Sequence, residues 1–232
     1  MEPTINGLAK LTLLDFPGRT AATVFLAGCN FRCPFCHNAP LVTGLEGAQH
    51  ISYAELEAFL KKRAGLLDGV AVTGGEPTLR PELPDLLRLI RRYGYEVKLD
   101  TNGTRPDVLA SLIDEGLIDY VAMDIKNSRE KYPATVGCGS VDMEAIERSI
   151  GMLREGRVEH EFRTTVVSGL HTDADMEDIG RWLRGEERYF LQNFVDPGAL
   201  IVPGTKGVSR DDMRRYLDIV RKYIPTAELR GM

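Results

Sequence analysis

Three cysteines lie close together in the sequence, at Cys29, Cys33 and Cys36, with C-x3-C-x2-C spacing. Three thiolates on one short loop can wrap an iron–sulfur cubane, each binding a different iron. Four irons with three protein ligands leave one iron open to an outside ligand. That open position distinguishes a cluster that does chemistry from a closed electron carrier. We therefore interpret the loop as a [4Fe–4S] site.

Other metal sites compete with this interpretation. A structural zinc ion needs four ligands, usually in two well-separated pairs. His37 could join the set, but it directly follows Cys36, which makes a shared tetrahedron awkward. Cys138 is the fourth cysteine, and no second motif surrounds it. A zinc or other closed site stays open as an alternative on spacing alone.

Three further polar segments could contact a ligand. Gly74-Gly75-Glu76-Pro77 can expose backbone groups that bind a zwitterion, although a tight strand-to-loop turn is the default explanation of this tetrapeptide alone. Asp100-Thr101-Asn102-Gly103 can be a simple polar turn closed by Asn-Gly. In Asp124-Ile125-Lys126 a buried lysine would need a carboxylate partner, which could be Asp124, Asp100 or a cofactor.

Alternating strands and helices must position these segments. Apolar β-branched runs predict six strands, and capping and period predict six helices. The predicted strands are Thr20–Ala27, Val70–Thr73, Glu96–Thr101, Ile118–Ile125, Val158–Val167 and Tyr189–Val195. The predicted helices are Ser52–Ala64, Pro81–Tyr93, Pro106–Glu115, Val141–Arg154, Asp173–Leu183 and Arg210–Tyr223. This alternation predicts an α/β fold with a parallel sheet in a single domain, residues 1–232.

The candidate residues share one position relative to these strands. Cys29, Gly75 with Glu76, Asn102 and Lys126 follow the first, second, third and fourth strands respectively. In parallel β/α folds the site forms at the carboxyl ends of the strands. We expect one shared site there, while periodicity alone does not decide between a barrel and an open sheet.

Composition narrows the class of protein. Apolar residues make up 43% and charged residues 27%, and the net charge is −5. Mild acidity argues against nucleic-acid and anionic-membrane surfaces. No apolar stretch is long enough to span a bilayer, so we expect a cytoplasmic protein. In a reducing compartment, clustered cysteines indicate metal rather than disulfides.

The cysteine loop after the first strand, with Phe35 just before the last cysteine and with the Gly-Gly-Glu segment, resembles the radical S-adenosylmethionine (SAM) enzymes. The resemblance implies a partial (β/α)6 TIM-like barrel, open on one side, in one radical SAM domain. It implies a cluster on Cys29, Cys33 and Cys36 that reductively cleaves SAM to a 5′-deoxyadenosyl radical. The residues that it implies for cofactor binding are Phe35, Cys36, His37, Gly74, Gly75, Glu76, Asn102, Asp124, Ile125 and Lys126. The acidic residues at the strand ends would help organise the site, around a monovalent cation in one version.

Within that superfamily, Leu13–Gly18, Val24–Cys29 and Cys36-His37-Asn38 look like the activating enzymes of glycyl-radical enzymes. The nearest group is the anaerobic ribonucleoside-triphosphate reductase activating proteins, although this chain carries all six β/α units and the best-known ones are shorter. The resemblance implies an oxidoreductase of anaerobic metabolism that installs a glycyl radical on a partner and takes electrons from reduced flavodoxin or ferredoxin.

Cysteine number and two further positions refine this picture. Only Cys138 remains beyond the triad, so there is no set for a second cluster. Arg163 could contact the cofactor, and some relatives have a histidine where Phe194 falls, near the ribose. Two alternatives stay open: a small-molecule radical SAM enzyme such as a 7-carboxy-7-deazaguanine synthase, and a non-catalytic Fe–S electron carrier or metal-stabilised binding module.

Overall fold

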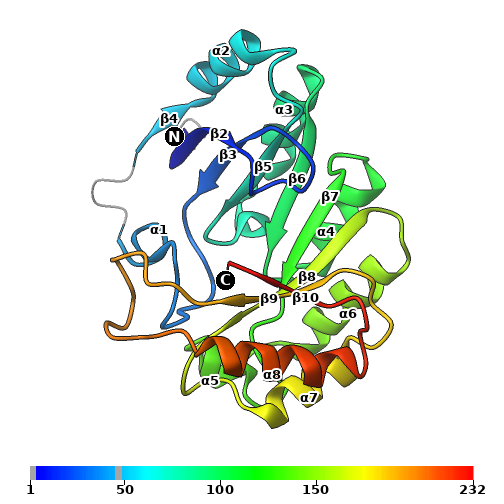
Figure 1. Cartoon of the computed structure of the whole chain (residues 1–232). Coiled ribbons are helices and arrows are strands. Elements are labelled where there is room, and N and C mark those ends of the chain that lie inside the picture. Colours follow the sequence, from blue (N-terminus) through cyan, green and yellow to red (C-terminus); the bar gives the residue numbers. More distant parts are fainter. Residues whose placement is uncertain (1–3, 45–48, 232) are drawn as a thin grey trace. The chain divides into compact units, whose positions relative to one another are not determined.

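The computed structural model describes residues 4–44 and 49–231, and it has an α/β fold (Figure 1). The strands are β1 Thr4–Ile5, β2 Gly7–Thr12, β3 Ala21–Leu26, β4 Ile51–Ser52, β5 Gly69–Gly74, β6 Glu96–Thr101, β7 Tyr120–Asp124, β8 Glu159–Val166, β9 Tyr189–Asn193 and β10 Glu228–Arg230. The helices are α1 Ala39–Thr43, α2 Tyr53–Arg63, α3 Leu83–Arg92, α4 Pro106–Asp114, α5 Tyr132–Thr135, α6 Met143–Arg154, α7 Asp173–Trp182 and α8 Arg210–Arg221, with a 3-10 turn η1 at Pro77–Leu79.

The chain divides into two compact units. The first unit holds residues 1–30, 40–122 and 145–159, and the second holds residues 31–39, 123–144 and 160–232. The cysteine loop and strand β7 each contribute to both units. The prediction of a single domain over residues 1–232 stays a prediction.

In the first unit, three parallel strands lie side by side in the order β3, β5, β6 (Figure 1). Ala21 to Leu26 of β3 pair in unbroken register with Gly69 to Gly74 of β5. Strand β2 adds to the other side of β3 in the antiparallel sense. Since β3 and β5 end in the same register, the segments that follow them emerge next to each other.

Capping residues and buried leucines explain the helices of the first unit. Ser52 and Glu55 form a reciprocal capping box at the start of α2. Gly65 follows α2 with φ +75°, a conformation that glycine adopts without strain. Helix α3 buries a stripe of leucines with Ile90, and burial of such a stripe holds an amphipathic helix on its sheet.

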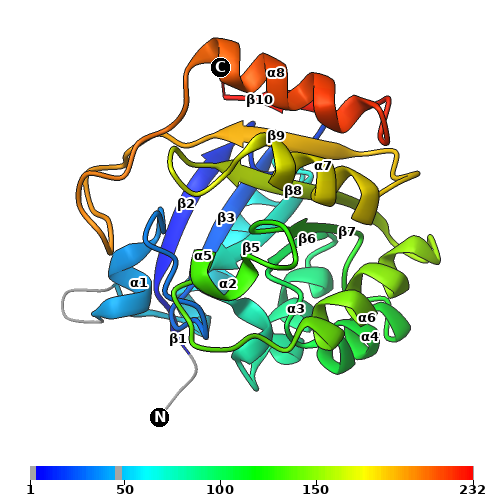
Figure 2. The ribbon, with the colours of Figure 1, turned by 90° about the horizontal axis from the view of Figure 1, so that it is seen from below.

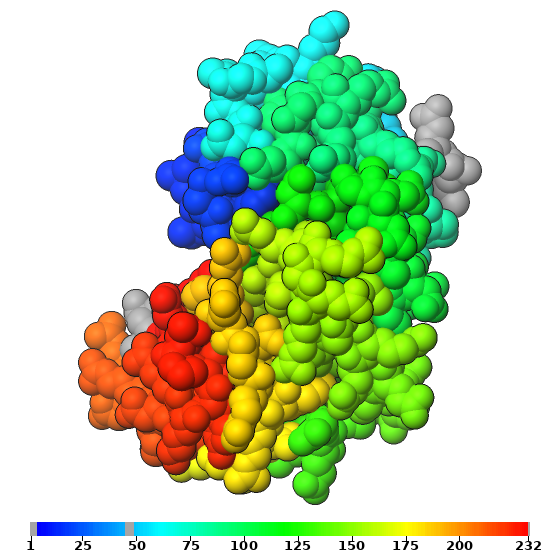
Figure 3. Space-filling view, turned by 90° about the vertical axis from the view of Figure 1, so that its right-hand side faces the viewer, coloured from blue at the N-terminus to red at the C-terminus, as the bar shows by residue number. Residues whose placement is uncertain are grey.

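In the second unit, β8, β9 and β10 are parallel. Helices α7 and α8 pack side by side next to these strands (Figure 2). Helix α8 turns Met213, Tyr216, Leu217 and Val220 inward, and its other face, which carries arginines and aspartates, is exposed. The red and orange atoms of Figure 3 show this part of the chain at the surface.

All six predicted strands and all six predicted helices are present, with ends that differ by a few residues at most. The α/β class and the parallel pairing are therefore confirmed. The short elements β1, β2, β4, β10, α1 and α5 were not predicted. No helix in the part of the chain that the structure describes is long and apolar enough to cross a membrane.

Candidate active site

The predicted cluster ligands lie on the loop after β3. None of the four cysteines, all of them within the described residues, is in a disulfide. Cys29 belongs to the first unit, and Cys33 and Cys36 belong to the second. Within residues 4–44 and 49–231, no three His, Cys, Asp or Glu side chains gather around a single ion-sized point. A cubane spaces its ligands more widely, because each thiolate binds a different iron. Ligation of a cluster by these three thiols stays a prediction.

Cys33 and Cys36 close a tight turn. The Cys36 N–H donates to the Cys33 carbonyl oxygen over 3.1 Å. Burial raises the pKa of the Cys36 thiol because it disfavours the thiolate, and the Asn38 backbone, Lys126 and Arg32 oppose that rise. Iron binds thiolates, so loading of the predicted cluster would release the proton held on Cys36.

Backbone contacts in the second unit hold this turn from two sides. The Arg32 N–H donates to the Val136 carbonyl over 2.8 Å, and the Val202 N–H donates to the Pro34 carbonyl over 3.1 Å. Gly137 adopts φ +66°, and a Cβ there would stand 2.4 Å from the Arg32 carbonyl oxygen. The segment around Gly137 thus supports the cluster loop, a role that sequence reasoning missed. In the sequence, the only local feature that could have indicated this role is the pair of glycines on either side of Cys138.

Two aromatic side chains of the loop pack on the residue that follows β9. Phe35 meets Phe194 edge to face, with ring centroids 6.3 Å apart. The His37 imidazole stacks on the same ring at 5.1 Å, and its Nε2 lies 2.9 Å from the Val195 carbonyl oxygen. Phe194 is therefore buried beneath the loop. Cofactor contacts by Phe35 and His37 stay predictions, but their packing role is plain.

The Gly-Gly-Glu segment joins the end of β5 to the residues just before Cys29. The Gly75 N–H donates to the Leu26 carbonyl, and the Glu76 N–H donates to the Gly28 carbonyl, each over 2.8 Å. A Cβ on Gly74 would stand 2.2 Å from the Leu26 carbonyl oxygen. A Cβ on Gly75 would stand 2.0 Å from that of Gly28. Both glycines are needed for this close approach of backbone to backbone, whatever ligand they contact in addition.

Glu76 ties the ends of β5 and β6 together and is only 1% exposed. Its carboxylate accepts hydrogen bonds from the Thr101 hydroxyl over 2.8 Å and from the Asn102 N–H over 2.6 Å. It also accepts from the Thr78 N–H at the start of η1. Burial raises the pKa of Glu76, and these hydrogen bonds work against that rise. The side chain works first as an internal brace of the site.

Asn102 extends the brace to the cluster loop. Its amide Nδ2 donates to Asn30 Oδ1 over 2.9 Å, and Asn30 in turn donates to the Thr104 hydroxyl over 3.0 Å. Asn30 is the residue after Cys29. In the first unit the structure therefore brings the predicted residues Gly75, Glu76 and Asn102 together beside Cys29, through Asn30, which was not predicted.

The Asp-Ile-Lys segment forms a three-charge cluster in the second unit. Asp124 Oδ2 lies 2.9 Å from Lys126 Nζ, and Asp124 Oδ1 lies 2.9 Å from Arg163 Nε. Burial opposes the charge on Asp124, but Arg163 and Lys126 outweigh it and hold the pKa of Asp124 well below its usual range. Burial likewise opposes the charge on Lys126, and the Asp124 carboxylate and Cys33 raise its pKa above its usual value. The carboxylate partner of Lys126 is thus Asp124. Together the three charged side chains sum to one positive charge.

His171 fixes the backbone of the same segment. It is 3% exposed, its Nε2 lies 3.0 Å from the Lys126 carbonyl oxygen, and its Nδ1 accepts from the Val167 N–H over 3.1 Å. Burial lowers the pKa of His171, so the neutral imidazole with a proton on Nε2 fits both partners. These contacts give His171 a structural role.

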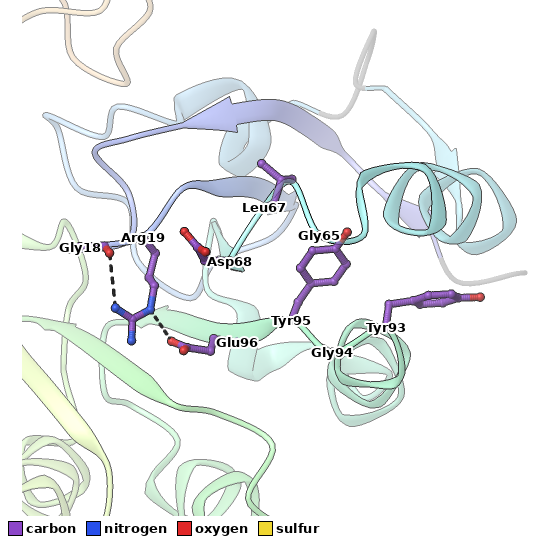
Figure 4. A pocket seen from close by; sticks show the side chains of 9 residues that line it. All are labelled: Gly18, Arg19, Gly65, Leu67, Asp68, Tyr93, Gly94, Tyr95 and Glu96. Atoms are coloured by element: carbon purple, nitrogen blue, oxygen red, sulfur yellow. Dashed lines mark hydrogen bonds and ion pairs between the residues drawn. The ribbon is translucent and has the colours of Figure 1, made fainter.

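The first unit also has a pocket of about 490 Å³ at the opposite ends of its strands (Figure 4). Asp68, directly before β5, and Glu96, the first residue of β6, line it together with Arg19. Arg19 Nε pairs with Glu96 over 2.7 Å, both side chains being well exposed. Sites of parallel β/α folds form at the carboxyl ends of strands, so this pocket lies away from the predicted site at the Glu76 end.

Two relatives with known or assigned roles resemble this chain. A protein of Methanocaldococcus jannaschii, provisionally named a glycyl-radical enzyme activating enzyme, is 32% identical over 236 aligned positions, covering 99% of this chain and 97% of the relative. The pyruvate formate-lyase-activating enzyme of Clostridium pasteurianum is 32% identical over 128 positions, covering 53% of this chain and 52% of that enzyme.

A solved structure shares the fold. The radical SAM methyltransferase of Sphaerobacter thermophilus matches 95% of this chain and 68% of its own, with a TM-score of 0.69 at 21% identity. The sequence profile of the Radical SAM superfamily matches residues 23–183, which include all three predicted cluster cysteines and the segments around Glu76, Asn102 and Lys126. The chain therefore belongs to the radical SAM superfamily, whose members use a [4Fe–4S] cluster and SAM.

Proposed function

We propose that this protein is an activating enzyme that installs a glycyl radical on a partner enzyme. The observation that carries the proposal is the M. jannaschii relative, which aligns with nearly the whole of both chains and bears that activity in its name. The C. pasteurianum activating enzyme adds support over half of each chain. The cysteine count agrees, because the triad leaves only Cys138 and a second cluster has no ligands.

The Asp124–Lys126–Arg163 cluster would receive the carboxylate of SAM. A pair of cations held by one carboxylate carries one surplus positive charge, which suits an anionic group. Lys126 and Arg163 are 16% and 14% exposed at their side chains, so both can be reached while most of the surrounding water is excluded. In this role Asp124 orients the two cations and does not contact the ligand.

The first unit would set the position of Cys29 and present backbone groups to the amino end of SAM. Gly75 and Glu76 clamp the Gly28 backbone, and Asn102 holds Asn30. These contacts flank Cys29 on both sides in the sequence. Fixing the backbone around Cys29, the first predicted ligand, matters because a misplaced ligand weakens a metal site markedly.

When bound, the cluster and SAM supply reductive cleavage to a 5′-deoxyadenosyl radical, which takes a Cα hydrogen atom from a glycine of the partner. Glycine suits that role because it has no side chain to block approach. We propose the anaerobic ribonucleoside-triphosphate reductase or a similar glycyl-radical enzyme as the partner, and reduced flavodoxin or ferredoxin as the electron donor.

The test uses anaerobically reconstituted protein with SAM and dithionite, alone and with candidate partner enzymes. We expect 5′-deoxyadenosine, and a protein-centred doublet in electron paramagnetic resonance when the right partner is present. A small-molecule product with no doublet from any candidate partner would replace the proposal with small-molecule radical chemistry. A reducible cluster that binds no SAM would replace it with electron transfer.

A further inference from the structure

A buried lysine lies beside one of the two acidic strand ends. Lys98 and Asp100 are two residues apart on β6, so their side chains leave the strand on the same face. Lys98 is 1% exposed, and its ammonium group contacts Asp100 Oδ1. Both residues belong to the first unit. The ion pair is therefore a fixed internal feature of that unit.

This pair bears on a cation at Asp100. A buried ammonium group is tolerated only where a carboxylate neutralises it. The same contact neutralises Asp100, and a Na⁺ or K⁺ ion bound to Asp100 would lie next to the like charge of Lys98. Such an arrangement is repulsive, and most strongly so in a buried place with few water molecules.

Asp124, at the end of β7, is likewise neutralised by cations of the chain. Both carboxylate oxygens of Asp124 contact a cation of the chain, Oδ1 with Arg163 and Oδ2 with Lys126. The sum over these three groups is one positive charge, which disfavours a further cation. The carboxylates of Asp100 and Asp124 are thus each neutralised by a cation of their own unit. Neither offers the net negative charge that a monovalent ion needs.

We propose that Lys98 supplies at Asp100 the positive charge that a bound Na⁺ or K⁺ would otherwise provide, so that SAM binds here without a monovalent metal cation. The site residues do not fit such an ion. Lys98 is thus a positioning residue, which acts on the cofactor through Asp100 and the strand end that follows it. The inference rests on the SAM site of the proposed function and is independent of the partner.

The first experiment needs no variant. The affinity of the cluster-loaded protein for SAM is measured by calorimetry in choline chloride, NaCl and KCl at equal ionic strength of about 0.1 M, which matches screening. We expect equal dissociation constants, within about twofold. Tightening by about tenfold or more in NaCl or KCl, which is about 1.4 kcal/mol, would overturn the inference. Failure to bind SAM in all three salts would overturn the proposed function itself.

The second experiment creates the ion site. Lys98→Met keeps the length and the apolar stem but removes the positive charge that contacts Asp100. We expect the variant's melting temperature and SAM affinity to rise with KCl or NaCl and not with choline chloride. Lys98→Met combined with Asp100→Asn should lose that response, and Lys10→Met, at an exposed lysine of β2, should never show it. A Lys98→Met protein that folds and binds SAM with equal affinity in all three salts would contradict the inference.

Discussion

Replacing Gly75 by alanine tests how the end of β5 positions the cluster loop. The added Cβ would stand 2.0 Å from the Gly28 carbonyl oxygen, whereas ordinary contacts begin at 3.4 Å. The two backbones must therefore separate by roughly 1.4 Å, and no side-chain rotation can relieve the clash. Separation on this scale lengthens the hydrogen bonds from Gly75 to Leu26 and from Glu76 to Gly28, both 2.8 Å in the structure.

These terms give an expected cost. Overpacking of a rigid site costs about 1–3 kcal/mol, and each lost hydrogen bond costs about 1 kcal/mol. Gly75→Ala should therefore lower the free energy of unfolding by about 3–5 kcal/mol, a large share of the stability of a typical domain. Because Gly28 directly precedes Cys29, iron incorporation should fall as well.

The assay is urea denaturation of the metal-free protein under anaerobic conditions, followed by iron analysis after reconstitution. Gly151→Ala is the matched control, since a Cβ there meets no atom within 4 Å and the residue is inside α6. That control should gain about 0.5–1 kcal/mol from helix propensity and keep its iron. If Gly75→Ala unfolds within about 1 kcal/mol of the unchanged protein and loads iron fully, the reasoning about this contact is refuted.

Three other changes test the second unit and the ligands. Asp124→Asn should cost about 2 kcal/mol near pH 7, because two partly exposed cations lose their carboxylate. The lowered pKa of Asp124 gives stability that is present above about pH 4 and lost as the pH falls further, so the variant's urea midpoint should depend less on pH below 4; an unchanged acid profile would contradict this. Phe194→Leu should remove the stack with His37, cost about 1 kcal/mol by urea denaturation, and speed loss of the cluster to a chelator followed by absorbance; equal rates would contradict the packing role. Cys33→Ala should abolish the cluster absorbance, while Cys138→Ala, the matched control, should keep it. The reverse result would show that Cys138 rather than Cys33 is a cluster ligand.

Local signals in the sequence accounted for most of the fold. The capping box of Ser52 and Glu55 and the glycines after α2, α3 and α4 act within a few residues, and all of these glycines adopt positive φ. Strand β10 has no such local signal. It is only three residues long, and the Arg230 side chain makes two hydrogen bonds to buried Glu161 from far away in the sequence.

The same distinction applies to the site. Its location at strand ends was predictable, because parallel strands carry their carboxyl ends to one edge. Its internal contacts were not. The Asn30–Asn102 and Asp124–Arg163 pairs join residues 72 and 39 positions apart, and an amide or a guanidinium has no sequence pattern that names its partner. The two glycines of the Gly-Gly-Glu segment were expected to let a ligand approach the backbone. In the structure they let the backbone of Leu26 and Gly28 approach instead.

The segment between Val195 and Val202 is attached to the cysteine loop near both of its ends, by the contact of His37 with Val195 and by that of Val202 with Pro34. Loss of the predicted cluster from this loop would therefore loosen the segment, and a protease should then cut there first. Damage to the metal centre would then be recorded as a permanent break in the polypeptide.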